Sequence, residues 1–142
     1  MEEITRGYCI DSAILIDYRR GIEDARTFLS QASKDTTLYI SVVSIVELYA
    51  GEETKQEEKR THIERFLKDF VVIPLHESLA QIAGEFRRDY DKPFADMIIA
   101  ANAHAYHLRL ATRNITHFEA LHTGTATGNG SDTAPTAAEI TR

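Results

Sequence analysis

The stretch Leu38-Tyr39-Ile40-Ser41-Val42-Val43 points to the fold class, because it is a β-branched and aromatic run of the kind that forms buried strands. Ile45, Leu48 and Tyr49 follow it at helical spacing. Gly51 suits the end of that helix. A strand that leads directly into a helix is the building unit of a parallel sheet.

Strands and helices are expected to alternate over the rest of the chain as well. Tyr8-Cys9-Ile10 is typical of a short strand that ends at Asp11, with Ser12 as the cap of the next helix. The other expected elements are helices over 22–32, within 52–69, over 78–89 and over 94–107, strands over 71–75 and 108–112, and one or two helical turns over 114–121. This order predicts an α/β fold with a mainly parallel sheet covered by helices on both faces. Functional residues of such folds gather at the carboxyl ends of the strands.

The composition is that of one globular domain followed by a tail. Of the 142 residues, 43% are hydrophobic and 27% are charged, which supports neither a disordered nor a fibrous chain. Residues 1–121 are expected to form the domain, and residues 122–142, rich in Thr, Ala, Gly and Ser, are expected to be a disordered tail. No apolar run approaches the roughly 20 residues of a membrane span, and the start lacks a basic signal sequence, so we expect a cytoplasmic protein.

Charge and cysteine content limit the partners and the kinds of site. With 16 basic and 22 acidic residues the net charge is -6, which argues against binding nucleic acid by bulk attraction. A polyanionic substrate would therefore need local basic groups or metal ions. The single cysteine, Cys9, excludes an internal disulfide and a multi-cysteine zinc site, and we expect it to be buried as a small hydrophobic residue.

Three acids, Asp11, Glu47 and Asp96, lie next to or within apolar segments. Each has a structural explanation of its own. Asp11 could cap the next helix, Ser44 and Glu47 form the pattern of a capping box, and Asp96 could stabilise a helix that begins near Pro93. All three together, in this order of strands and helices, are better explained by convergence on one pocket.

A pocket of clustered carboxylates requires a positive charge, since the acids would otherwise repel one another. Mg²⁺ or Mn²⁺ fits best, because these cations take oxygen ligands and bridge to substrate phosphates. The chemistry predicted for such a pocket is phosphodiester hydrolysis.

Four segments of the chain form a recognisable set. They are Tyr8-Cys9-Ile10-Asp11-Ser12, Ser44-Ile45-Val46-Glu47-Leu48-Tyr49-Ala50-Gly51, Ala95-Asp96-Met97-Ile98-Ile99-Ala100-Ala101-Asn102-Ala103, and Leu110-Ala111-Thr112-Arg113-Asn114-Ile115-Thr116-His117-Phe118. These segments resemble the PIN-domain nucleases, and their order and spacing resemble the VapC-type toxins of prokaryotic type II toxin-antitoxin pairs. The resemblance extends over about residues 7–121.

The resemblance implies a PIN-like three-layer fold with four to five parallel strands and a Mg²⁺- or Mn²⁺-dependent endoribonuclease. It also implies a homodimer, an RNA substrate and a small VapB-like antitoxin. Asp11, Glu47 and Asp96 match the three acidic metal-site residues of the family. Thr112 matches the Thr or Ser that supports the site, and Asn114 matches a position where many members have a fourth acid.

This chain departs from the family pattern at two places. Asn114 supplies an amide where a fourth acid would complete the set, which would weaken the binding of a second metal. The Thr- and Gly-rich tail also begins where members commonly have a last apolar strand, so a fifth strand is in doubt.

Other residues have alternative interpretations. His104, His107, His117 and His122 could suggest a zinc or acid-base site, but without a cysteine or a clear third ligand we interpret them as solvated helix-end histidines. Arg113 could contact a phosphate or only offset local acids. The rival functional reading is a PIN-like RNA- or protein-binding module with little or no catalysis, which RNA cleavage assays would distinguish.

Overall fold

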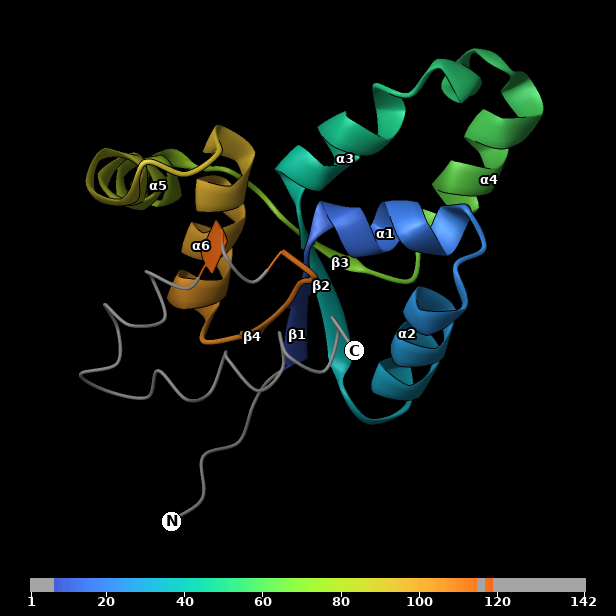
Figure 1. Cartoon of the computed structure of the whole chain (residues 1–142), viewed down its shortest axis with the longest axis horizontal. Coiled ribbons are helices and arrows are strands. Elements are labelled where there is room, and N and C mark those ends of the chain that lie inside the picture. The colour runs from blue at the N-terminus through green and yellow to red at the C-terminus, as the bar shows by residue number, and fades with distance from the viewer. Residues whose placement is uncertain (1–6, 115–116, 119–142) are drawn as a thin grey trace.

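A computed structural model describes residues 7–114 and 117–118 of the chain. Its four strands form one parallel sheet in the order β3-β2-β1-β4 (Figure 1). The strands are β1 (Gly7–Ile10), β2 (Thr37–Ser41), β3 (Val71–Ile73) and β4 (Arg109–Ala111). The helices are α1 (Ser12–Arg19), α2 (Glu23–Asp35), α3 (Val42–Tyr49), the 3₁₀ helix η1 (Glu52–Lys55), α4 (Glu57–Leu67), α5 (Glu77–Tyr90) and α6 (Phe94–Tyr106). The predicted α/β fold with a parallel sheet is confirmed.

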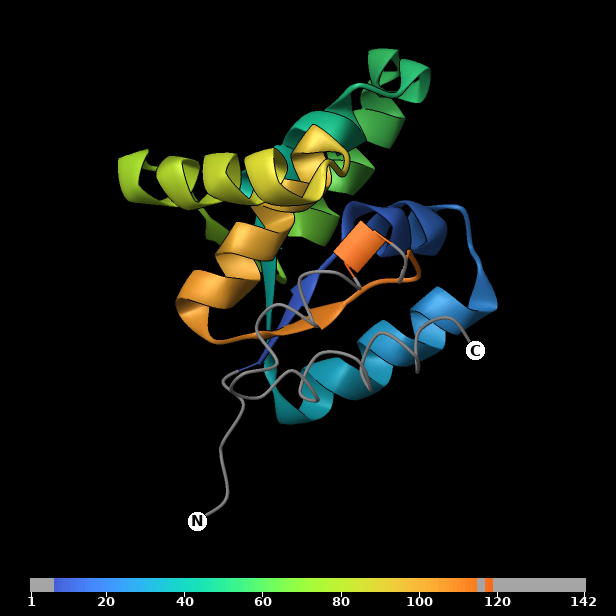
Figure 2. The same cartoon turned by 60° about the vertical axis from the view of Figure 1, so that its left-hand side comes forward.

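Helices cover both faces of the sheet, as expected for an all-parallel sheet. Side chains alternate along the strands, so that Cys9 and Leu110 face a core with α5 and α6. Ile10, Ile40 and Ala111 face the opposite core, which α1 and α2 cover. The two views agree that α6 and α2 lie on opposite sides of the strands (Figures 1 and 2). The result is the three-layer arrangement that the resemblance implied.

The junction of β2 and α3 lies two residues earlier than the sequence suggested. The side chain of Ser41 accepts a hydrogen bond from the backbone N–H of Val43 at 3.1 Å and so caps α3. Val42 and Val43 therefore belong to the helix, although their β-branched side chains favour a strand. The capping box of Ser44 and Glu47 is not formed, because the cap is three residues before Ser44.

Gly7 allows β1 and β2 to approach closely at their paired ends. It pairs with Thr37, and a Cβ atom added at Gly7 would lie 2.1 Å from the Thr37 carbonyl oxygen. Any side chain at this position would force the two backbones apart. Glycine at residue 7 is thus required by the sheet itself.

Two expectations on the ends of the chain lie outside the described residues. These are the disordered tail over 122–142 and most of the helical turns over 114–121, of which His117 and Phe118 are described as helical. A fifth strand, if it follows Phe118, would lie there as well. Cys9 is buried as predicted, and no helix among the described residues is both long enough and apolar enough to span a membrane.

Candidate active site

Asp11 follows the carboxyl end of β1 and occupies the N-cap position directly before α1. Its side chain does not cap that helix. Instead its carboxylate accepts a hydrogen bond of 2.6 Å from the hydroxyl of Thr112, which follows β4. The backbone N–H of Asp11 also donates to the carbonyl of Ala111 at 2.9 Å. Because β1 and β4 are neighbours in the sheet, their ends bring Asp11 and Thr112 together.

The Asp11 carboxyl group is 2% exposed, and burial raises its pKa to about 6. The hydrogen bond from Thr112 opposes this shift. The negative charges of Asp96 and Glu47 raise the pKa further. The three acids are therefore close enough to influence one another electrostatically, although 36 and 49 residues separate them along the chain.

Glu47 is positioned by a pair of serine hydroxyls. Ser12, the first residue of α1, donates a hydrogen bond to Oε1 of Glu47 on α3. The hydroxyl of Ser12 also lies 2.7 Å from that of Ser44. Ser12 was expected as a helix cap. It begins the helix instead, and its side chain connects α1 to the acid on α3.

Asp96 is the third residue of α6, and Pro93 occupies the cap position of that helix. The α6 helix runs back along the sheet before β4, so its first turn lies at the edge where β1 and β4 end. His117 pairs through Nδ1 with Oδ2 of Asp96. Burial raises the pKa of Asp96, and the charge and hydrogen bond of His117 oppose that shift. The two side chains are 13% and 37% exposed respectively.

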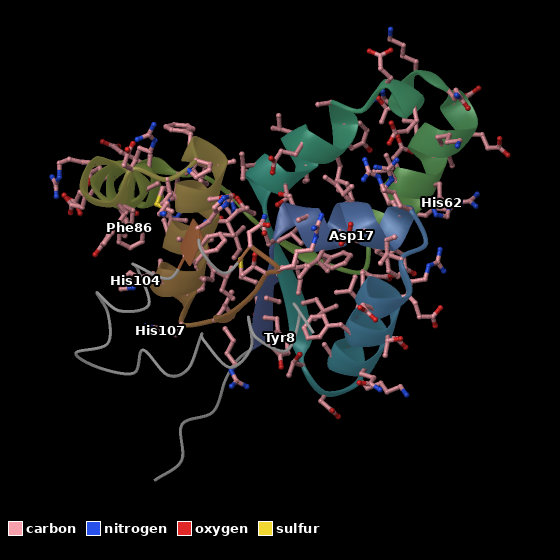
Figure 3. The ribbon with its side chains drawn as sticks, viewed as in Figure 1. Tyr8, Asp17, His62, Phe86, His104 and His107 are labelled. Atoms are coloured by element: carbon pink, nitrogen blue, oxygen red, sulfur yellow. The ribbon has the colours of Figure 1, made fainter. Side chains whose placement is uncertain are left out.

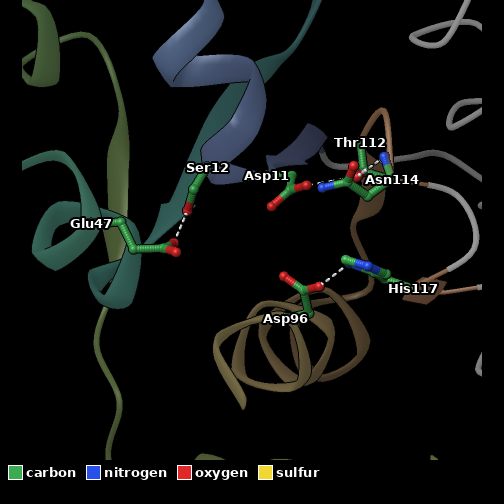
Figure 4. Close-up of polar contacts among 7 residues, drawn as sticks. All are labelled: Asp11, Ser12, Glu47, Asp96, Thr112, Asn114 and His117. Carbon is green, nitrogen blue, oxygen red and sulfur yellow. Dashed lines mark hydrogen bonds and ion pairs between the residues drawn. The ribbon is translucent and has the colours of Figure 1, made fainter. Parts of the chain in front are cut away.

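The three acids come from three separate elements and surround one region of the molecule (Figure 4). Thr112 supports Asp11, while the backbone N–H of Asn114 donates to the Thr112 hydroxyl at 2.9 Å. The structure thus brings Asp11, Glu47, Asp96, Thr112 and Asn114 to one edge of the sheet, where the sequence predicted a site.

A family model for the PIN domain matches residues 8–121. The chain belongs to the PIN-domain family. Ribonuclease VapC10 of Mycobacterium tuberculosis, in strains CDC 1551 / Oshkosh and ATCC 25618 / H37Rv, is 40% identical over 114 residues, which cover 77% of this chain and 84% of that protein. The family predicted from the sequence is therefore confirmed.

Several solved structures share the fold of this PIN domain. A toxin-antitoxin complex from Klebsiella pneumoniae has a TM-score of 0.68 at 28% identity, over 79% of this chain and 90% of that one. VapBC2 from Rickettsia felis, solved bound to a DNA fragment from its promoter, has a TM-score of 0.70 at 23% identity, with the same coverage. FitAcB from Neisseria gonorrhoeae has a TM-score of 0.65 at 22% identity, over 80% and 91%.

The donor set of this PIN domain suits a hard divalent cation. Asp11, Glu47 and Asp96 offer carboxylate oxygens, and Mg²⁺ needs only one or two of these because it keeps several of its waters. Among the described residues, no three His, Cys, Asp or Glu side chains are grouped as the direct ligands of one ion. Glu47 and Asp96 each have a hydrogen-bond donor from the protein, from Ser12 and His117 respectively. The residues thus fit a water-rich cation such as Mg²⁺ better than zinc, which requires a closed set of ligands.

The histidines of the PIN domain divide into two groups. His104 on α6 and His107 directly after that helix are both exposed (Figure 3), and the ring of His104 contacts the Phe86 ring at a centroid distance of 5.7 Å. For these two residues the interpretation as solvated histidines is confirmed. It is wrong for His117, and His122 lies outside the described residues. The signal for His117 is its position in the sequence, three residues after Asn114 and within the helical turns expected over 114–121.

Arg113 pairs with Asp17, an acid on α1. Its Nε lies 2.8 Å from Oδ2 of Asp17, whose side chain is 15% exposed. The pair borders a pocket lined by Ile14, Ile22 and Phe28. Arg113 therefore neutralises a local acid in this structure, the second of the two roles considered for it.

Proposed function

We propose that this PIN domain is a VapC-type toxin, an endoribonuclease that hydrolyses RNA phosphodiester bonds with Mg²⁺ or Mn²⁺. The observation that carries the proposal is the buried Asp11, whose pKa is raised partly by the charges of Asp96 and Glu47. A carboxylate cluster of this kind suits a cation and a phosphate. The identity of 40% to ribonuclease VapC10 and the likeness to the Klebsiella pneumoniae complex support it.

Asp11, Glu47 and Asp96 would hold the metal, with Asn114 as an auxiliary ligand or a group that orients water. The cation would supply charge neutralisation at the phosphate and an activated water. Thr112 keeps the Asp11 carboxylate oriented, and the backbone N–H of Asn114 keeps Thr112 in place. Arg113 would contact a phosphate of the RNA after it leaves Asp17. Its side chain is half-exposed and is therefore accessible to a substrate.

The test is cleavage of a labelled RNA by the purified protein with Mn²⁺, with Mg²⁺ and with EDTA. Asp11→Asn and Asp96→Asn are each expected to lower the cleavage rate by about 100-fold or more, because each removes a charge needed for the cation. The same change at Asp89, an exposed acid on α5 paired with Arg88, should leave the rate unchanged. Cleavage by both site variants at the wild-type rate would contradict the role given to the acids, and a wild-type protein that cleaves no RNA with either metal would favour an RNA- or protein-binding module.

We propose further that a small VapB-like antitoxin inhibits the enzyme by placing a cation, most simply an arginine, among the three acids. A guanidinium group can pair with carboxylates through two hydrogen bonds at once. Asp96→Asn should therefore weaken the complex, measured as a faster dissociation of the bound antitoxin. A complex in which Asp11, Glu47 and Asp96 stay open to solvent would contradict this mechanism.

A further inference from the structure

Three residues that follow β4, Thr112, Asn114 and His117, connect two of the acids through a series of hydrogen bonds. Thr112 donates to Asp11, and the backbone N–H of Asn114 donates to Thr112. The backbone N–H of His117 then donates to the carbonyl of Asn114 at 3.0 Å, and the His117 ring pairs with Asp96. Thr112 and His117 thus each contact one of the acids, as Figure 4 shows.

Phe118, the next residue in the sequence, also limits where the His117 ring can lie. Phe118 is 6% exposed and belongs to the core that α5 and α6 form with the sheet. Because Phe118 is anchored in that core and the backbone N–H of His117 is bonded to Asn114, the main chain that carries the imidazole ring is fixed, and the ring itself contacts Asp96 on α6. A side chain free in solvent would not be held in this way.

The contact with Asp96 also determines how that carboxylate can be used. A carboxylate accepts hydrogen bonds, so Nδ1 of His117 carries the proton of this bond. The bond occupies Oδ2 of Asp96 and leaves Oδ1 for another partner. Hydrogen-bonded partners of this kind orient metal ligands, and their loss typically costs about 10- to 100-fold in metal affinity.

We infer that His117 is a positioning residue for Asp96: it holds the carboxylate through Nδ1 so that the remaining oxygen faces the cation. This inference rests on the proposed function, since it assumes that Asp96 belongs to the metal site. The competing role for His117 is direct ligation of the metal by Nε2. The two roles use different ring nitrogens, so substitution of His117 by Asn or by Gln distinguishes them.

The test is Mn²⁺ binding by the full-length protein, measured by titration calorimetry without RNA. In His117→Asn the side-chain amide nitrogen takes the place of Nδ1 and can still donate to Asp96. In His117→Gln the side-chain amide takes the place of Nε2 instead. We expect Mn²⁺ affinity to fall about 10- to 100-fold in His117→Ala and His117→Gln, and to stay within about threefold of wild type in His117→Asn. His62→Ala, at an exposed histidine on α4, is the matched control and should bind as wild type does.

The inference is overturned if His117→Ala binds Mn²⁺ as tightly as wild type, or if Gln preserves binding and Asn does not. The second result would mean that Nε2 ligates the metal. Should the alanine variant fail to fold, the comparison of Asn with Gln decides by itself. Asp96→Asn is measured beside them. If wild type and Asp96→Asn bind equally, or neither binds, the proposed function fails, whereas a loss in Asp96→Asn alone contradicts only the role of His117.

Discussion

Asp11 makes the stability of the protein depend on pH, because its carboxyl group is buried and its pKa is raised to about 6. The unfolded chain titrates this group near its ordinary value of about 3.9. Between about pH 4 and pH 6 the folded state therefore binds more protons than the unfolded state. The contribution of Asp11 to stability is present in full below about pH 4 and is lost as the pH rises through about 6.

We expect this loss to disappear in Asp11→Asn, which keeps an acceptor for Thr112 but carries no charge. The difference in the free energy of unfolding between the two proteins should grow by at most about 1.4 kcal/mol per pH unit over that window, in favour of the variant. Urea unfolding from pH 4 to pH 8 in EDTA measures it. A constant difference across the range would show that Asp11 titrates normally.

At this scale the sequence predicted the acids and, through the family resemblance, Thr112 as a support, but not the partners of Glu47 and Asp96. Asp11, Glu47 and Asp96 stand out because an isolated charge in an apolar segment needs an explanation. The hydroxyl of Ser12 lies 35 residues from Glu47, and His117 lies 21 residues from Asp96. Contacts of that kind depend on how helices pack across the edge of the sheet, which local patterns do not describe.

At the scale of the elements, the close approach of β1 to β2 can be tested at Gly7. Gly7→Ala is expected to destabilise the protein by about 1–3 kcal/mol, because the new Cβ atom would clash with the carbonyl of Thr37. Gly84→Ala, in the middle of α5 with open space around it, should instead stabilise by up to about 1 kcal/mol. Equal effects of the two substitutions on urea unfolding would contradict the close approach of the strands.

The order of helices and strands could be predicted because the apolar period changes at each junction. The exact junctions could not, as β2 and α3 show. Val42 and Val43 favour a strand by their own preference, but the Ser41 cap starts the helix before them. Asp11 is a second example. Its side chain suits a helix cap, but it accepts a hydrogen bond from Thr112, which follows β4.

For the whole molecule we propose a homodimer, as the family resemblance implies. Val46 on α3 and Phe94 on α6 are 64% and 68% exposed, although both are large and apolar. The two helices that carry them pack against each other. Exposed apolar groups on neighbouring elements are typical of a surface that another protein covers.

The double variant Val46→Glu with Phe94→Glu should therefore sediment as a monomer, while wild type sediments at twice the mass of the chain. A charge in a covered apolar surface loses its water without a partner, which weakens association. Leu75→Glu, at an exposed leucine beyond β3, is the control and should stay dimeric. If the double variant remains dimeric, the interface lies elsewhere.

The pairing of β4 with β1 also has a consequence for the synthesis of the protein. Thr112 supports Asp11 from a position 101 residues later in the chain, and His117 follows it. The ribosome therefore synthesises all three acids before Thr112 and His117, which contact two of them. Because chains emerge from the N-terminus onward, a nascent or prematurely terminated polypeptide lacks the supported centre. If the proposed function holds, the protein can cleave RNA only when translation of the domain is almost complete.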